Sequence, residues 1–75
     1  MKVSIEYCSL WNYLPRASSL EADLKKKFPE CEVTLISSGG GVFEVTLDGN
    51  LIFSKKALER FPNPNEIEEL IEEQQ

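Results

Sequence analysis

"KVSIEYCSLWNYLPRASSL", residues 2–20, decides how this chain folds. Apolar and polar residues alternate over residues 3–7, as they do in a half-buried β-strand, and Cys8 ends the alternation. Apolar residues then recur at helical spacing, and Pro15 suits the first turn of a helix. The stretch therefore predicts a strand and a helix that are joined by a loop of residues 9–13, which we call the Cys8 loop.

The rest of the sequence predicts three more strands and a second helix. Alternating apolar residues indicate strands over residues 31–35 and 43–47, and a short apolar run indicates a further strand over residues 51–53. Asp48 and Gly49 predict a hairpin turn between the last two strands. A helix cap, a first-turn proline and a capping-box acid follow at Asn63, Pro64 and Glu66. These three residues predict a helix that buries Ile67, Leu70 and Ile71.

The order of these elements, βαβββα, predicts a single α+β domain over residues 1–75. Three of the strands alternate apolar with polar residues, whereas the strands of a sheet covered on both faces would be almost continuously apolar. We therefore expect a two-layer fold in which both helices cover one face of a four-stranded mixed sheet. The first two strands are connected through a helix and should be parallel, with a right-handed crossover.

This topology places the two cysteines, Cys8 and Cys31, at opposite ends of the sheet. About six residues of strand at ~3.3 Å each separate the two ends. A disulfide requires Cα atoms only ~4.4 to 6.8 Å apart. We therefore exclude an intramolecular dithiol cycle and interpret Cys31 as a small core residue, while Cys8 is expected to be an accessible thiol.

Composition removes several classes of function. The formal net charge is −5, which disfavours nucleic acid and anionic membranes as partners. The chain has no histidine and two cysteines, so a structural zinc site, a catalytic triad and a histidine acid/base pair lack their parts. No apolar run approaches the ~20 residues of a membrane span, and the first residues do not resemble a signal peptide. We expect a cytoplasmic protein without a metal.

Short motifs over nearly the whole chain carry a family resemblance. In order they are the run of residues 3–7, Cys8, "LPRA" at 14–17, "FP" at 28–29, "GGVFEV" at 40–45, "DG" at 48–49, "FSKK" at 53–56 and "RFP" at 60–62. Together they resemble the bacterial branch of the selenoprotein W family. The resemblance implies a thioredoxin-like fold and a Cys-x-x-Cys or Cys-x-x-selenocysteine loop. Cys8 matches the first cysteine of that motif, but Trp11 stands in place of the second.

The implied strand order gathers a candidate site around Cys8. In a thioredoxin-like sheet the second and third strands flank the first, so "SSGGG", residues 37–41, must cross the end of the first strand. We call this segment the glycine crossing. Two interpretations of its glycines remain open. Either the backbone N–H groups bind an extended thiol peptide or glutathione, or the glycines only allow the chain to cross. The residues expected around Cys8 are Ser9, Leu10, Trp11, Tyr13, Arg16, Gly39, Gly40, Gly41, Lys55, Lys56 and Phe61.

Three functions remain open for this site. In the first, Cys8 is a reactive monothiol that forms mixed disulfides with glutathione, as co-substrate, or with a client protein. Nearby cations and a helix N-terminus would favour its thiolate, whereas the large apolar residues of the Cys8 loop would disfavour it. In the second, the domain has lost catalysis and binds a protein partner. In the third, Cys8 is structural. We expect a monomer or a weak dimer and no other cofactor.

Overall fold

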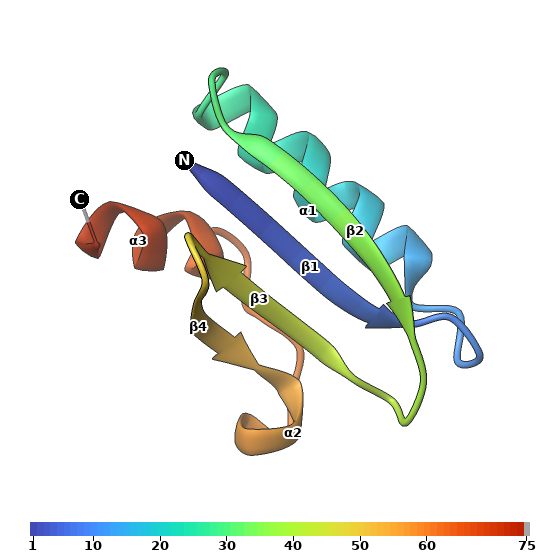
Figure 1. The fold of residues 1–75 in the computed structure, drawn as a ribbon. Coiled ribbons are helices and arrows are strands. Elements are labelled where there is room, and N and C mark those ends of the chain that lie inside the picture. Colours follow the sequence, from blue (N-terminus) through green and yellow to red (C-terminus); the bar gives the residue numbers. More distant parts are fainter. Residues whose placement is uncertain (75) are drawn as a thin grey trace.

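The computed structural model describes residues 1–74 and shows one mixed sheet with helices on one side (Figure 1). Its elements are β1 (Lys2–Cys8), α1 (Leu14–Lys27), β2 (Glu32–Ser38), β3 (Phe43–Leu47), β4 (Asn50–Ser54), α2 (Lys55–Leu58) and α3 (Glu66–Glu73). The predicted order is confirmed, with the short helix α2 as an addition. Within residues 1–74, no helix has the length and apolar character to cross a bilayer.

The first strand of the chain lies inside the sheet, whose order is β2-β1-β3-β4. β1 runs parallel to β2 and antiparallel to β3, and β4 is antiparallel to β3. The register pairs Lys2 with Glu32 at one end of β1 and Cys8 with Ser38 at the other. Because Cys31 directly precedes Glu32, the two cysteines lie at opposite ends of the sheet, as the sequence predicted.

The hydrophobic core lies between the sheet and the two longer helices. Both helices and three strands supply its buried residues, and β2 packs partly buried side chains against them; the buried residues are Val3, Ile5, Ala17, Leu24, Cys31, Phe43, Val45, Leu47, Phe53, Ile67 and Ile71. Val3, Ile5, Val45 and Leu47 share one face of the sheet, so both α1 and α3 cover that face (Figure 1). Leu24 is fully buried, and its truncation to alanine would cost ~2–5 kcal/mol.

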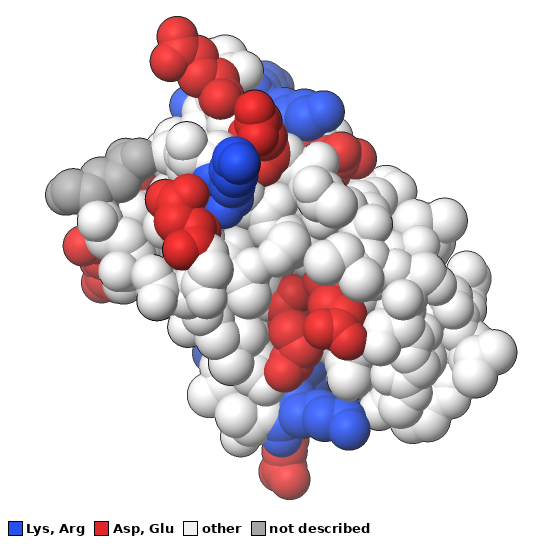
Figure 2. Space-filling view, in the orientation of Figure 1, with Lys and Arg blue, Asp and Glu red and all other residues white. Residues whose placement is uncertain are grey.

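The opposite face of the sheet is open and partly polar. Ser4 and Thr46 form a hydrogen bond between their hydroxyl groups across β1 and β3. One step along, Glu6 lies directly opposite Glu44. Figure 2 views this face and shows acidic side chains over the central strands. Ser54 donates a hydrogen bond to Oε1 of Glu44 at 2.8 Å, while Oε2 is buried and lacks a partner among residues 1–74.

The start of α3 differs from the sequence prediction. The helix begins at Glu66 rather than at Pro64, because Asn65 before it adopts the left-handed conformation, with φ of 67°. Pro64 and Asn65 instead form a turn. Even so, Glu66 behaves as the predicted capping-box acid, since its Oε1 accepts a hydrogen bond from the N–H of Asn63 at 2.8 Å.

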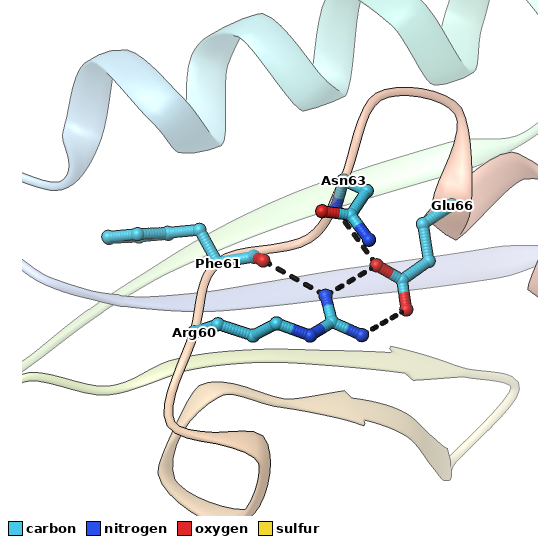
Figure 3. A network of polar contacts seen from close by, with 4 residues as sticks. All are labelled: Arg60, Phe61, Asn63 and Glu66. Carbon is cyan, nitrogen blue, oxygen red and sulfur yellow. Dashed lines mark hydrogen bonds and ion pairs between the residues drawn. The ribbon is translucent and has the colours of Figure 1, made fainter.

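Arg60 completes this corner (Figure 3). Its guanidinium donates to both carboxylate oxygens of Glu66, at 2.7 and 2.9 Å, and to the carbonyl oxygen of Phe61 at 3.1 Å. The hydrogen bonds from Arg60 and from the N–H of Asn63 lower the pKa of Glu66 to about 2. They fix the path of the chain between α2 and α3, which positions Phe61.

Candidate functional site

Cys8 is enclosed by two segments of backbone at the end of β1. Its N–H donates to the carbonyl oxygen of Val42 at 2.9 Å, and its own carbonyl oxygen accepts from Tyr13 at 3.1 Å. The next residue, Ser9, donates from its N–H to the carbonyl oxygen of Ser38 at 3.0 Å. These bonds bring the Cys8 loop and the glycine crossing together at the end of β1, which confirms the predicted course of residues 37–41.

The thiol of Cys8 is not accessible in this conformation. The residue is 0% exposed, so the expectation of an accessible thiol is wrong for the folded state. The reason is that the chain passes the end of β1 twice, through the Cys8 loop and through the glycine crossing. Any reaction at this sulfur requires one of these two segments to move.

Trp11, which stands where the family motif has its second cysteine, packs on the glycine crossing. A β-carbon added to Gly41 would overlap the indole ring, at 2.9 Å from Cε3 of Trp11. Gly41 also has a φ of +71°, which side chains disfavour, so both space and backbone conformation require glycine here. Trp11 nevertheless remains 61% exposed and the neighbouring Leu10 84% exposed. The Cys8 loop thus combines one packing contact with a large outward apolar surface.

A cluster of aromatic rings continues from Trp11 towards α3. The ring centroids of Trp11 and Tyr13 are 6.1 Å apart, those of Tyr13 and Phe61 4.8 Å, and those of Phe61 and Phe43 5.4 Å. All three pairs meet edge to face, the arrangement that aromatic quadrupoles favour. The cluster joins the Cys8 loop to the segment between α2 and α3, and Phe43 connects it to the core.

Two of the predicted basic residues pack on these rings. The guanidinium of Arg16 lies 4.0 Å from the centroid of Phe61. The ammonium of Lys55 lies 5.5 Å from the centroid of Tyr13 and 5.3 Å from that of Phe61. Both contacts are within the ~6 Å range of cation–π attraction. Lys55 and Phe61 therefore lie beside Tyr13 of the Cys8 loop, as the sequence predicted. The positive charges of Arg16 and Lys55 rest on aromatic rings.

The remaining predicted residues lie along the crossing. The hydroxyl of Ser9 donates to the carbonyl oxygen of Ser38 at 3.3 Å. A β-carbon added to Gly40 would lie 3.6 Å from Nζ of Lys56, whereas one added to Gly39 would meet nothing within 4 Å. The structure therefore gives two adjoining groups of site residues, one around Cys8 and the glycine crossing and the other around Phe61.

Sequence reasoning missed three contributors to this site. Val42 supplies the carbonyl oxygen that binds the N–H of Cys8, and a backbone group leaves no side-chain signal. Phe43 pairs with Tyr7 across the sheet, a relationship that requires the strand register. Asn12 takes the left-handed conformation, with φ of 60°, inside the Cys8 loop. Asparagine tolerates this conformation well, so a turn at Asn12 was open to prediction.

Cys31 has a separate environment. It is 7% exposed and belongs to the core cluster, and its Sγ lies 3.8 Å from the carbonyl oxygen of Leu24. Both cysteines are free thiols. The position of Cys31 at the far end of the sheet confirms that it cannot form a disulfide with Cys8 within the same molecule.

The βαβββα order, the strand order and a cysteine at the junction of β1 and α1 define a thioredoxin-like domain. The sequence model of the Rdx family matches residues 2–73, and the chain belongs to this family. Selenoprotein W of Gallus gallus is 36% identical over 59 residues, which cover 75% of this chain and 69% of that protein. The resemblance to selenoprotein W is thereby confirmed, and the chain belongs to a group that is generally associated with redox functions.

Further relatives and solved structures agree with this assignment. Migration and invasion enhancer 1 of Bos taurus is 28% identical over 71 residues, and the chain spans 62% of the length of that protein. A selenoprotein W-related protein of Vibrio cholerae superposes with a TM-score of 0.90 at 27% identity, over 96% of this chain and 92% of that one. A protein of Bordetella parapertussis gives a TM-score of 0.93 at 24% identity, over 99% and 96%, which supports the fold alone.

Proposed function

We propose that this chain is a cytoplasmic thiol redox protein in which Cys8 acts as a monothiol and forms mixed disulfides with glutathione or with a client protein. The observation that carries the proposal is the position of Cys8 between β1 and the loop into α1, in a family related to selenoprotein W. Cys31 is at the far end of the sheet. A second thiol must therefore come from outside the molecule.

The thiol becomes reactive when the Cys8 loop opens. Leu10 and Trp11 are already 84% and 61% exposed, so moving the loop uncovers little additional apolar surface. The interactions that must break are the packing of Trp11 on Gly41, the ring contact between Tyr13 and Phe61, and a few backbone hydrogen bonds, such as that from Tyr13 to Cys8. Segments with so few buried contacts open at a low free energy compared with global unfolding.

The exchange itself needs only glutathione as the second reactant. The Cys8 thiolate attacks the glutathione sulfur of a glutathionylated client, a sulfur–sulfur bond forms at Cys8, and the client thiolate leaves and takes up a proton. A free glutathione thiolate then attacks the glutathione sulfur of the mixed disulfide. This step returns Cys8 to the thiol and releases oxidised glutathione. Over the two steps, the mixed disulfide of the client is reduced to a thiol, and two glutathione molecules are oxidised to one molecule of oxidised glutathione.

Intact-mass measurement of the folded protein after exposure to oxidised glutathione tests this proposal. We expect the mass of one glutathione to be added to the parent and to Cys31→Ser, and none to Cys8→Ser. The adduct should disappear on addition of reduced glutathione. Cys31→Ser is the matched control, because it removes a buried thiol from the other end of the sheet.

The opposite result would redirect the assignment. If Cys8 is modified only at denaturant concentrations that unfold the whole chain, the loop does not open and the monothiol function is wrong. The protein would then be expected to act as a thioredoxin-like interaction module. The specific observation that favours this second function is the exposure of Leu10 and Trp11 side by side in one loop. Binding to a partner would then be lost in Leu10→Ser and Trp11→Ser but kept in Cys8→Ser.

A further inference from the structure

The glycine crossing carries backbone donors that have no acceptor within the described chain. Gly39, Gly40 and Gly41 lie between β2 and β3, and Gly40 and Gly41 form a turn. Within residues 1–74, none of their N–H groups donates a hydrogen bond to a backbone or side-chain oxygen. Successive N–H groups in a turn form concave sites for anions. The crossing therefore offers donors for an anion at the end of β1, where Cys8 lies.

Gly41 is the most enclosed of these glycines. It is buried, whereas Gly39 is half-buried and Gly40 is exposed, and the ring of Trp11 lies on it. Its φ of +71° follows a φ of +69° at Gly40, so two consecutive residues have the left-handed backbone that suits glycine. Because Trp11 belongs to the Cys8 loop, the opening that exposes the thiol also uncovers Gly41. The donors of the crossing and the sulfur thus become available together.

Lys56 brings a positive charge to the crossing. Its Nζ lies 3.6 Å from the position that a β-carbon of Gly40 would take. Lys56 is exposed, and among residues 1–74 its ammonium takes part in no hydrogen bond, ion pair or contact with an aromatic ring. Arg16 and Lys55, by contrast, lie on aromatic rings. Of the predicted site cations, Lys56 is therefore the one placed to meet a ligand at the crossing.

Positive charge near Cys8 matters because the chain as a whole is acidic. The formal net charge of −5 repels anions in general, so an anionic substrate depends on cations close to the thiol. Glu44 is an acid of the same region, since its Oε1 accepts a hydrogen bond from Ser54, two residues before Lys56. The ion pairs of the described chain do not join Glu44 to Lys56. Glu44 therefore does not hold the ammonium away from the crossing.

We infer that the glycine crossing and Lys56 bind a carboxylate of glutathione, so that Lys56 determines which disulfides react at Cys8. The carboxylate accepts hydrogen bonds from the N–H groups of Gly39 and Gly40 and pairs with the ammonium of Lys56. Charge-assisted hydrogen bonds of this kind are stronger than neutral ones. The inference rests on the proposed redox function and deepens it, because it names glutathione as the thiol that the site recognises.

The contact holds glutathione beside the sulfur while the exchange takes place. The Cys8 thiolate attacks one sulfur of oxidised glutathione, a bond between Cys8 and that sulfur forms, and the original sulfur–sulfur bond breaks. The second glutathione leaves as a thiolate and takes up a proton. Lys56 forms no covalent bond in this step, so its effect is on which disulfide is held beside the thiol.

Titration of ¹⁵N-labelled Cys8→Ser with S-methylglutathione, followed by NMR, tests the binding site separately from the chemistry. The variant lacks the reacting thiol and the ligand is a thioether, so no exchange takes place. We expect saturable shifts in residues 39–41 and in Lys56. The diethyl ester of S-methylglutathione, in which both carboxylates are blocked, should give no such shifts.

Variants of two exposed lysines isolate the charge of Lys56. Lys56→Gln should raise the Kd for S-methylglutathione about three- to fivefold, the size of a favourable exposed ion pair. Lys56→Arg keeps the charge and should keep the Kd of the parent. Lys26→Gln removes the same charge from the last turn of α1, at the other end of the sheet from Cys8, and should leave the Kd unchanged because salt screens distant charges.

Exchange rates provide a second measurement. In a Cys31→Ser background, the rate of reaction with oxidised glutathione is compared with the rate for cystamine, a disulfide that carries ammonium groups and no carboxylates. Lys56→Gln should lower the ratio of the two rates about threefold or more, and Lys56→Arg should restore it. A purely structural role of Lys56 would change both rates alike and leave their ratio unchanged.

Three outcomes would overturn the inference. They are equal shifts with S-methylglutathione and its diethyl ester, equal effects of Lys56→Gln and Lys26→Gln on the Kd, and a rate ratio that stays the same in Lys56→Gln. If Cys8 of the parent reacts with both disulfides, these results leave the redox proposal standing. If Cys8 reacts with neither disulfide while S-methylglutathione still binds at residues 39–41, the redox proposal is wrong and the crossing remains a binding site for glutathione.

Discussion

The indole ring of Trp11 lies directly on the backbone of Gly41, where no β-carbon would fit. This contact joins the Cys8 loop to the glycine crossing beside a thiol that is 0% exposed. In the selenoprotein W pattern the position of Trp11 belongs to the second redox group. In this chain that position holds Trp11, which packs on Gly41 and holds the Cys8 loop against the glycine crossing.

Gly41→Ala should destabilise the fold. The new methyl group meets both the positive φ of 71° and the indole ring, so we expect a loss of ~1–3 kcal/mol in the free energy of unfolding. Urea denaturation measures the change. Gly39→Ala is the matched control, because a β-carbon there meets nothing within 4 Å, and its effect should be within ~1 kcal/mol. Equal losses in both variants would contradict the contact between Trp11 and Gly41.

Trp11→Ala should expose the thiol of Cys8 more often. In a Cys31→Ser background, we expect the native-state rate of reaction with a small aromatic disulfide to rise about tenfold, as ~1.4 kcal/mol of loop packing is lost. The rate is measured from the absorbance of the released thiol. Leu51→Ala removes a side chain of similar exposure, 59%, from β4 and should leave the rate unchanged. An unchanged rate in Trp11→Ala would show that another segment controls access to Cys8.

Glu66 should make stability depend on pH under acidic conditions. Its pKa in the folded protein is about 2, below the ordinary value of 4.5, because Arg60 and the N–H of Asn63 stabilise the carboxylate. The stabilisation is therefore complete above about pH 4.5 and is lost as the pH falls towards about 2. Comparing urea midpoints of the parent and Glu66→Gln across this range should give a difference that shrinks with acid. Glu69 does not contact Arg60 or the N–H of Asn63, so the difference in urea midpoint between the parent and Glu69→Gln should vary less with pH.

Glu6→Gln should stabilise the protein. Glu6 lies directly opposite Glu44 in the sheet, and like charges in this position are unfavourable by ~0.2–1 kcal/mol. We expect a gain of that size in urea denaturation, and the gain should decrease at high salt because the repulsion is screened. Glu32→Gln is the control, since Glu32 lies opposite Lys2 and its removal relieves no repulsion. A gain that is equal for both variants would indicate an effect of net charge alone.

Most of the fold was predictable from local pattern. Alternation specifies β1, β2 and β3, the turn at Asp48 and Gly49 introduces β4, and helical spacing with a proline in the first turn specifies α1. Helix α2 was missed because its single turn has no periodicity, and its cap is a side-chain contact in which Ser54 accepts from the N–H of Ala57 at 3.2 Å. The start of α3 was misplaced because the backbone conformation of Asn65 overrides the proline signal.

The sequence predicted which residues surround Cys8, but it did not predict that the thiol is buried. The family resemblance and the strand order indicated which residues surround Cys8. The burial of Cys8 depends on how the Cys8 loop and the glycine crossing close over the end of β1, which is a tertiary relationship. The role of Trp11 stayed open for the same reason.

The position of β1 inside the sheet has a consequence for synthesis of the chain. Lys2 and Asp48 bond to each other through both backbone N–H groups, across 46 residues of sequence. The N–H of Cys8 likewise cannot form its hydrogen bond until Val42 is present. At translation rates of ~5–20 residues per second, the thiol therefore leaves the ribosome some seconds before the segment that covers it leaves. The nascent chain is thus the form in which an oxidant reaches Cys8 without having to open a loop.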